Sequence, residues 1–153
     1  MKILVQQQKA LNMLDIAAKF VSKNSTLPIL QNIYLKASID SLLIRATDME
    51  KYVEIEIPCE VQIEGAITIN AKTFLDILKT IESENIELSV DQKTNIMTIK
   101  TPKDTFDING IAASEYVALP EVPQENSFVL DTLAFSKGID HVEYAVTEKS
   151  FSP

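Results

Sequence analysis

The sequence predicts an α+β fold in which a β-α-β-β-β unit occurs twice within one domain. Two observations indicate it. A short strand leading directly into an amphipathic helix recurs along the chain, and about three further short strands follow each of the first two helices. The composition agrees, because 153 residues with 46% hydrophobic and 24% charged residues suffice for a soluble domain with a buried core.

The repeat is visible when the two ends of the chain are compared. The segment that begins at Ile3 and the segment that begins at Phe128 align at a constant offset of 125 residues, which places Leu14 on Ile139. A third copy begins at Ile67, between the other two. Each copy reads as a strand followed by a helix, so the sequence predicts three strand–helix pairs.

The three predicted helices each present one apolar face. Apolar residues recur at intervals of three or four, the spacing that places side chains on one side of a helix. They are Leu11, Leu14, Ala17, Ala18 and Val21 in the first helix, Phe74, Leu75, Leu78 and Ile81 in the second, and Phe135, Ile139, Val142 and Val146 in the third.

Strands rich in β-branched and aromatic residues follow the first two helices. We predict them at residues 33–37, 42–46 and 52–57, and again at 86–90, 96–100 and 105–108. The two units then complete a first domain at residues 1–111, and a linker with two prolines covers 112–125. Residues 126–153 begin a second domain with one strand and one helix.

Charge and special residues argue against several classes of protein. The formal net charge of −8 disfavours tight non-specific nucleic-acid binding, although lysines interrupted by acids line the polar side of each predicted helix. The single cysteine, Cys59, can form no internal disulfide and indicates the cytoplasm. No apolar run approaches membrane-spanning length, and no cysteine–histidine set suggests a metal site.

Several segments, in order along the chain, resemble the bacterial sliding clamp family, the DNA polymerase III β subunit. They are residues 26–32 (TLPILQN), 47–50 (TDME), 65–72 (GAITINAK), and the pair 106–108 (FDI) with 113–116 (ASEY). Val117 stands where the family usually has proline. The resemblance spans the whole chain and implies the DNA clamp fold, with helices on one face of antiparallel sheets.

Members of that family are processivity factors of DNA replication. Two subunits of three domains each form a ring that encircles double-stranded DNA and tethers the replicative polymerase. The resemblance therefore implies tethering without catalytic chemistry, metal or cofactor. A chain with about one and a quarter such domains is not expected to close a ring alone.

The resemblance implies DNA contacts on the helix-lined inner face of the ring. The matching positions here are Lys23, Asn24, Lys72, Lys149 and Pro153. The family often has arginine where Asn24 stands, and a proline side chain offers no hydrogen-bond donor. Contacts of this kind go to phosphates, so binding is expected to be weak and independent of base sequence.

The resemblance also implies a head-to-tail joint between two subunits of the full-length ring. The edge strand at 105–108 is expected to form it, with Phe106 and Ile108 as apolar anchors and with Thr73 and Lys103 nearby. The replicative polymerase and the clamp loader are expected to bind mostly through later parts of the family fold.

Other interpretations of the same residues remain open at this point. The lysines can be ordinary solvated helix faces, and Phe106 and Ile108 can be core residues of their strand. A protein-binding module that uses the exposed edge strand is the alternative function. An acid–base or metal site at Asp48, Glu50 and His141 is a weaker third, because a turn explains the two acids better.

Overall fold

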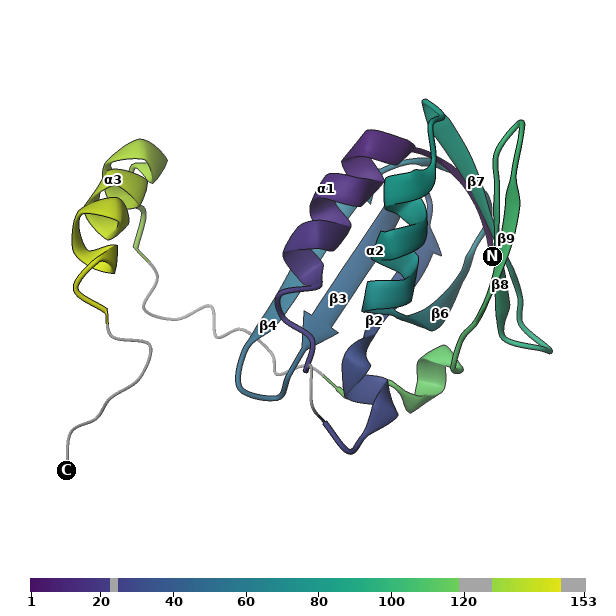
Figure 1. Ribbon diagram of the computed structural model, residues 1–153, viewed down its shortest axis with the longest axis horizontal. Helices are drawn as coiled ribbons and strands as arrows, with labels where there is room; N and C mark the ends of the chain where they lie inside the picture. The colour runs from purple at the N-terminus through teal and green to yellow at the C-terminus, as the bar shows by residue number, and fades with distance from the viewer. Residues whose placement is uncertain (23–24, 119–127, 147–153) are drawn as a thin grey trace. The chain divides into compact units, whose positions relative to one another are not determined.

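The computed structural model describes residues 1–22, 25–118 and 128–146 (Figure 1). The chain divides into two units, Met1–Leu119 and Pro120–Pro153. Among the described residues, no helix is both long and apolar enough to cross a membrane.

The first unit carries most of the regular structure. Its helices are α1 (Gln7–Ala17), η1 (Pro28–Gln31), α2 (Ala71–Thr80) and η2 (Ala113–Glu115), of which η1 and η2 are short 3-10 turns. Its strands are β1 (Lys2–Gln6), β2 (Asn32–Ser38), β3 (Ser41–Thr47), β4 (Tyr52–Pro58), β5 (Glu60–Ile63), β6 (Gly65–Asn70), β7 (Asn85–Asp91), β8 (Ile96–Lys100) and β9 (Thr105–Asn109).

The described strands form two antiparallel sheets. The five-stranded sheet has the order β5-β1-β7-β8-β9, and the four-stranded sheet has the order β4-β3-β2-β6. The two β-α-β-β-β units are therefore interlocked. The first strand of the first unit, β1, pairs with β7 of the second, and β6, which opens the second unit, pairs with β2 of the first. Neither unit forms a complete sheet without the other.

The helices cover one side of the sheets. In Figure 1, α1 and α2 lie side by side in front of the sheet that contains β2, β3 and β4. The helix α1 contacts β1, β3 and β4, and α2 contacts β6 and β9. Between these layers lies a core of aliphatic side chains around Phe74, which is 1% exposed. Burial of each such large side chain contributes about 1.5–3 kcal/mol before chain entropy is subtracted.

Local contacts explain where the two helices begin. The chain passes from β1 into α1 with no side-chain cap, but the amide Nε2 of Gln7 donates to the carbonyl oxygen of Leu78 in α2 at 2.8 Å. That bond joins the two helices from a buried position. The carboxamide Oδ1 of Asn70 accepts from the backbone N–H of Thr73 at 3.0 Å, which caps the N-terminus of α2.

Most of the predicted elements are confirmed, within two residues at each strand end. The predicted α+β class and the antiparallel sheets with helices on one face are confirmed as well. One strand was missed: β5 is four residues long, carries Glu60 and Gln62, and is defined only by its pairing with β1. The first unit also extends beyond residue 111, because the segment after β9 contacts β6.

The described part of the second unit is one helix, α3 (Thr132–Glu143). The carboxylate of Asp131 caps it by accepting from the N–H of Ala134 at 2.8 Å. The predicted helix is confirmed. Residues 128–130, where the sequence predicts a strand, form no regular structure in the described part of this unit, and the start of a second domain stays a prediction. An isolated strand has no partner for its backbone groups, and no other described residue of this unit supplies one.

Candidate nucleic-acid interface

The side of α1 and α2 that faces away from the core is polar and slightly basic. Its exposed charged residues are Lys9 and Asp15 on α1, Lys19 in the turn directly after it, and Lys72, Asp76 and Lys79 on α2. Four lysines against two aspartates give this helix face a formal charge of +2, whereas the whole chain carries −8. Asp15 and Lys19 form an exposed ion pair at 3.5 Å, so Lys19 contributes less positive potential than the other three.

The N-terminus of α2 offers the best-shaped place on this face for a phosphate. A hollow of about 450 Å³ lies beside it, between the first turn of α2 and the residues that follow α1. Ser22, Gln31, Asn70 and Lys72 supply its polar lining. The helix dipole favours an anion at such a position, and Lys72 adds a full charge, while the N–H of Thr73 is already bonded to the Asn70 cap.

Of the five predicted DNA contacts, only Lys72 lies within the described residues. It is exposed in the first turn of α2. Lys23, Asn24, Lys149 and Pro153 lie outside the described residues, so their predicted contacts stay predictions. Ser22, the last described residue before Lys23, is half-buried beside the hollow.

The predicted joint strand is the free edge of the five-stranded sheet. Among the described strands, β9 pairs only with β8. Ile108 is 5% exposed and belongs to the core, and Phe106 is half-buried against it. The burial of Ile108 supports the core interpretation for this residue. Phe106 and Ile108 lie two positions apart and therefore point to the same face of the strand, and their role as apolar anchors for a partner stays a prediction.

The hydrogen-bond pattern shows which groups β9 presents outward. The N–H of Gly110 donates to the carbonyl oxygen of Asn95 at 2.7 Å, and the N–H of Thr101 donates to that of Asp104 at 2.9 Å. These two bonds determine which residues of β9 bond to β8 and which alternate residues face outward. Phe106 and Ile108 thus bond with β8, and the backbone groups of residues 105, 107 and 109 point away from the sheet. The edge is available to another strand through its backbone.

Thr73 and Lys103 do not form one cluster. Thr73 lies in the first turn of α2, where its hydroxyl and N–H both bond to Asn70. Lys103 lies in the turn between β8 and β9, beside Thr80 at the opposite end of α2. Seven helical residues separate the two ends by about 10 Å. Only Lys103 adjoins the hairpin that carries the free edge.

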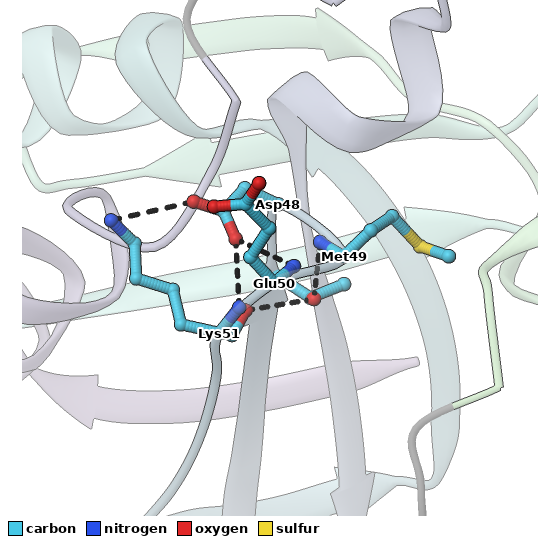
Figure 2. Close-up of polar contacts among 5 residues, drawn as sticks. Asp48, Met49, Glu50 and Lys51 are labelled. Atoms are coloured by element: carbon cyan, nitrogen blue, oxygen red, sulfur yellow. Dashed lines mark hydrogen bonds and ion pairs between the residues drawn. The ribbon is translucent and has the colours of Figure 1, made fainter. Parts of the chain in front are cut away.

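The acids of the 47–51 turn have a structural role (Figure 2). The carboxylate of Asp48 accepts from the N–H groups of Glu50 at 3.1 Å and Lys51 at 2.9 Å, and it pairs with the Lys51 ammonium at 3.3 Å. Its hydrogen bond from the backbone N–H of Lys51 is the main reason that the pKa of Asp48 lies below its usual value. The carboxylate thus closes the turn.

The same turn holds Met49 in a left-handed conformation, with φ of 79°. The hydroxyl of Thr47 accepts from the N–H of Met49 at 2.9 Å and donates to the carbonyl of Lys51 at 2.9 Å.

His141, the third residue of the predicted acid–base site, belongs to the second unit. No group of three or more potential metal ligands occurs in the part of the chain that the structure describes. The acid–base interpretation therefore has no geometric support.

The chain is similar to known proteins over its whole length. Residues 1–120 match the family model described as the DNA polymerase III beta subunit, N-terminal domain. The beta sliding clamp of Bacillus subtilis is 29% identical over 100% of this chain, and that of Staphylococcus epidermidis RP62A is 25% identical over the same share. The chain spans 42% of the length of each of these relatives.

Solved structures give the same picture. The DNA polymerase sliding clamp from Bacillus subtilis aligns with all of this chain and with 42% of its own, at a TM-score of 0.89 and 25% identity. The Helicobacter pylori beta clamp in complex with 3,4-difluorobenzamide aligns with 80% of this chain and 33% of its own, at a TM-score of 0.75 and 28% identity.

Proposed function

Since the chain belongs to the DNA polymerase III β subunit family, as its N-terminal domain, we propose that it forms part of a ring that encircles duplex DNA. In this role it is a cytoplasmic processivity factor that tethers the replicative polymerase. It performs no catalysis and uses no cofactor. The family assignment rests on the match of residues 1–120.

The observation that supports the DNA contact is the segregation of charge. A protein of net charge −8 repels DNA from most of its surface, but the helix face carries +2. Three lysines on two short helices, with Lys19 in the turn after α1, suit loose phosphate contact. Such contact slides along a duplex because it reads no bases. The hollow at the N-terminus of α2, with Lys72 at its rim, is the proposed first phosphate position.

The subunit joint is proposed at β9. Its outward N–H and C=O groups at 105, 107 and 109 can add a strand from a second subunit, head to tail. Phe106 and Ile108 are the predicted apolar anchors of that joint, although Ile108 is already buried in this domain. Binding of the replicative polymerase and the clamp loader is assigned to parts of the full-length ring beyond these residues.

The DNA contact is tested by removing the same number of positive charges from two different surfaces. One variant replaces the helix-face residues Lys9, Lys19, Lys72 and Lys79 by glutamine. Its control replaces four exposed lysines of the sheets and their turns, Lys36, Lys93, Lys100 and Lys103. Binding to a short labelled duplex is followed by fluorescence anisotropy at several salt concentrations.

The helix-face variant is expected to lose most of the affinity, and the slope of log K against log salt should shrink by up to about 3.6, at about 0.9 per phosphate contact. The control variant should keep the slope of the unmodified chain, because its lysines lie off the helix face. Equal weakening of both variants would mean that DNA senses only net charge, and the proposed interface would be wrong.

A further inference from the structure

The segment that leaves β9 crosses from one sheet to the other. Residues 111–116, here called the strap, include η2 and continue from the free edge of the five-stranded sheet to the four-stranded sheet. Ile111 donates to the carbonyl oxygen of Thr68 at 2.9 Å, and Thr68 donates to that of Ile111 at 3.0 Å. The strap thus occupies the edge of β6 that does not pair with β2.

Two buried polar side chains lie beneath the strap. The hydroxyl of Thr68, a residue with 0% exposure, donates to the carbonyl oxygen of Ile111 at 3.0 Å and accepts from the amide Nδ2 of Asn32 at 3.1 Å. Asn32 is 6% exposed. Loss of the strap would remove the backbone partners of Thr68, and an unpaired buried polar group is costly. The sheet and the strap therefore supply hydrogen-bond partners to each other.

Tyr116 fastens the far end of the strap. Its ring centroid lies 5.5 Å from that of Tyr34, and the guanidinium of Arg45 lies 5.8 Å from the centre of the Tyr34 ring. Its hydroxyl lies 3.4 Å from the carbonyl oxygen of Arg45 and 3.5 Å from that of Asn32. The hydroxyl thus lies within reach of carbonyl oxygens on both β2 and β3, and its one proton serves one of them at a time.

The phenol keeps its proton under physiological conditions. Burial raises the pKa of Tyr116 to about 12, outweighing the opposing hydrogen bond from the backbone and the nearby charge of Arg45. A protonated phenol is a donor, and two carbonyl acceptors, those of Asn32 and Arg45, lie within its reach. The geometry and the protonation state therefore agree.

We infer that the strap is an integral part of the first domain and that Tyr116 is its latch, the side chain that holds the strap against β2 and β3. The strap also shields the β6 edge, which leaves β4 as the edge at which the four-stranded sheet can be extended. This inference concerns the fold of the first domain and holds independently of DNA binding.

Amide hydrogen exchange of three variants tests the latch. Tyr116→Ala removes ring and hydroxyl, Tyr116→Phe removes the hydroxyl alone, and Tyr144→Ala is the control because Tyr144 is 87% exposed. The amides to follow are those of Ile111, Glu115 and Tyr116, which donate to Thr68, Ala112 and Ala113.

Tyr116→Ala should raise exchange at these three amides at least tenfold, Tyr116→Phe by less, and Tyr144→Ala not at all. Amides of Ile3 and Leu88, in the paired strands β1 and β7, report whether each variant folds and should stay protected. Unchanged exchange at Glu115 and Tyr116 in a folded Tyr116→Ala variant would overturn the latch.

The pH dependence of the stability gives a second test. A ring that only fills space, without a buried hydroxyl donor, would not change this dependence. Above pH 10 the phenol ionises in the unfolded chain but stays protonated in the folded one, so stability falls until the pH reaches about 12. Between pH 8 and pH 11 the unfolding equilibrium constant should rise in the unmodified chain. The factor of this rise should be up to about ten times as large as the factor in Tyr116→Phe. Identical pH dependence in both would contradict a buried hydroxyl donor and overturn the latch.

Discussion

Gly110 lies where the chain leaves β9 for the four-stranded sheet, and it has no room for a side chain. A Cβ atom built on it lies 2.7 Å from the carbonyl oxygen of Thr68 and 2.7 Å from Cδ1 of Ile67. One of these contacts is to backbone, which cannot swing aside as a side chain can. Glycine at this position permits the close approach through which Ile111 pairs with Thr68.

Gly110→Ala is therefore expected to lower the free energy of unfolding of the first domain by about 1–3 kcal/mol, the usual cost of forcing atoms into a filled space. Urea unfolding followed by circular dichroism measures it. The matched control is Gly138→Ala on α3, where a Cβ meets no atom within 4 Å and alanine favours the helix. A Gly110→Ala variant as stable as the unmodified chain would contradict the close packing.

Thr47 shows how one hydroxyl fixes a whole turn. It is 3% exposed, and its hydroxyl bonds to both Met49 and Lys51 (Figure 2). Together with Asp48 it closes the connection between β3 and β4 and keeps Met49 in its left-handed conformation. The turn is an element whose geometry comes from side-chain-to-backbone bonds rather than from glycine.

Thr47→Val keeps the shape of the side chain and removes its hydrogen bonds. We expect the free energy of unfolding to fall by about 1–3 kcal/mol, because the N–H of Met49 and the carbonyl of Lys51 lose their partner. Thr105→Val on the exposed outer side of β9 is the control and should change stability by less than about 0.5 kcal/mol. Equal thermal unfolding of both variants would show that the turn does not depend on this hydroxyl.

At the scale of elements, the periodicity of apolar residues predicted the helices and the longer strands, because local sequence determines them. The spacing of Leu14 and Leu78 with their neighbours predicts α1 and α2, and alternation predicts the longer strands. Pairing is a different matter, because it depends on contacts between distant residues. That β1 joins β7 rather than β2, and that β5 exists at all, follows from long-range hydrogen bonds that leave no local signal.

The same limit applies to the candidate site. Lys72 could be predicted because an exposed basic residue at the start of an amphipathic helix is visible in the sequence. The inward direction of Ile108 could not, since either face of a strand can be the buried one until its partner is known. The contact of Tyr116 with Tyr34 joins residues 82 positions apart and was missed for that reason.

At the scale of the whole molecule, the sheet edges decide how copies of the chain can meet. The strap covers β6, and β5 has only four residues with an irregular register. Two regular edges stay free among the described strands, that of β9 with five residues and that of β4 with seven. An exposed regular edge is a ready site for strand addition. Self-association of this chain is expected to use β9, the edge at which the subunit joint is proposed.

Asp107→Pro tests this expectation, because it removes the central outward N–H of β9 and no backbone bond to β8. It also removes the carboxylate that accepts from the Thr98 hydroxyl of β8 at 2.6 Å. The mass of the unmodified chain in light scattering should rise with concentration, while Asp107→Pro should remain monomeric. Asp107→Asn keeps the N–H and should associate like the unmodified chain, which separates the backbone from the charge. If Asp107→Pro folds and associates as the unmodified chain does, or if the unmodified chain stays monomeric at all concentrations, self-association of this chain through β9 is ruled out.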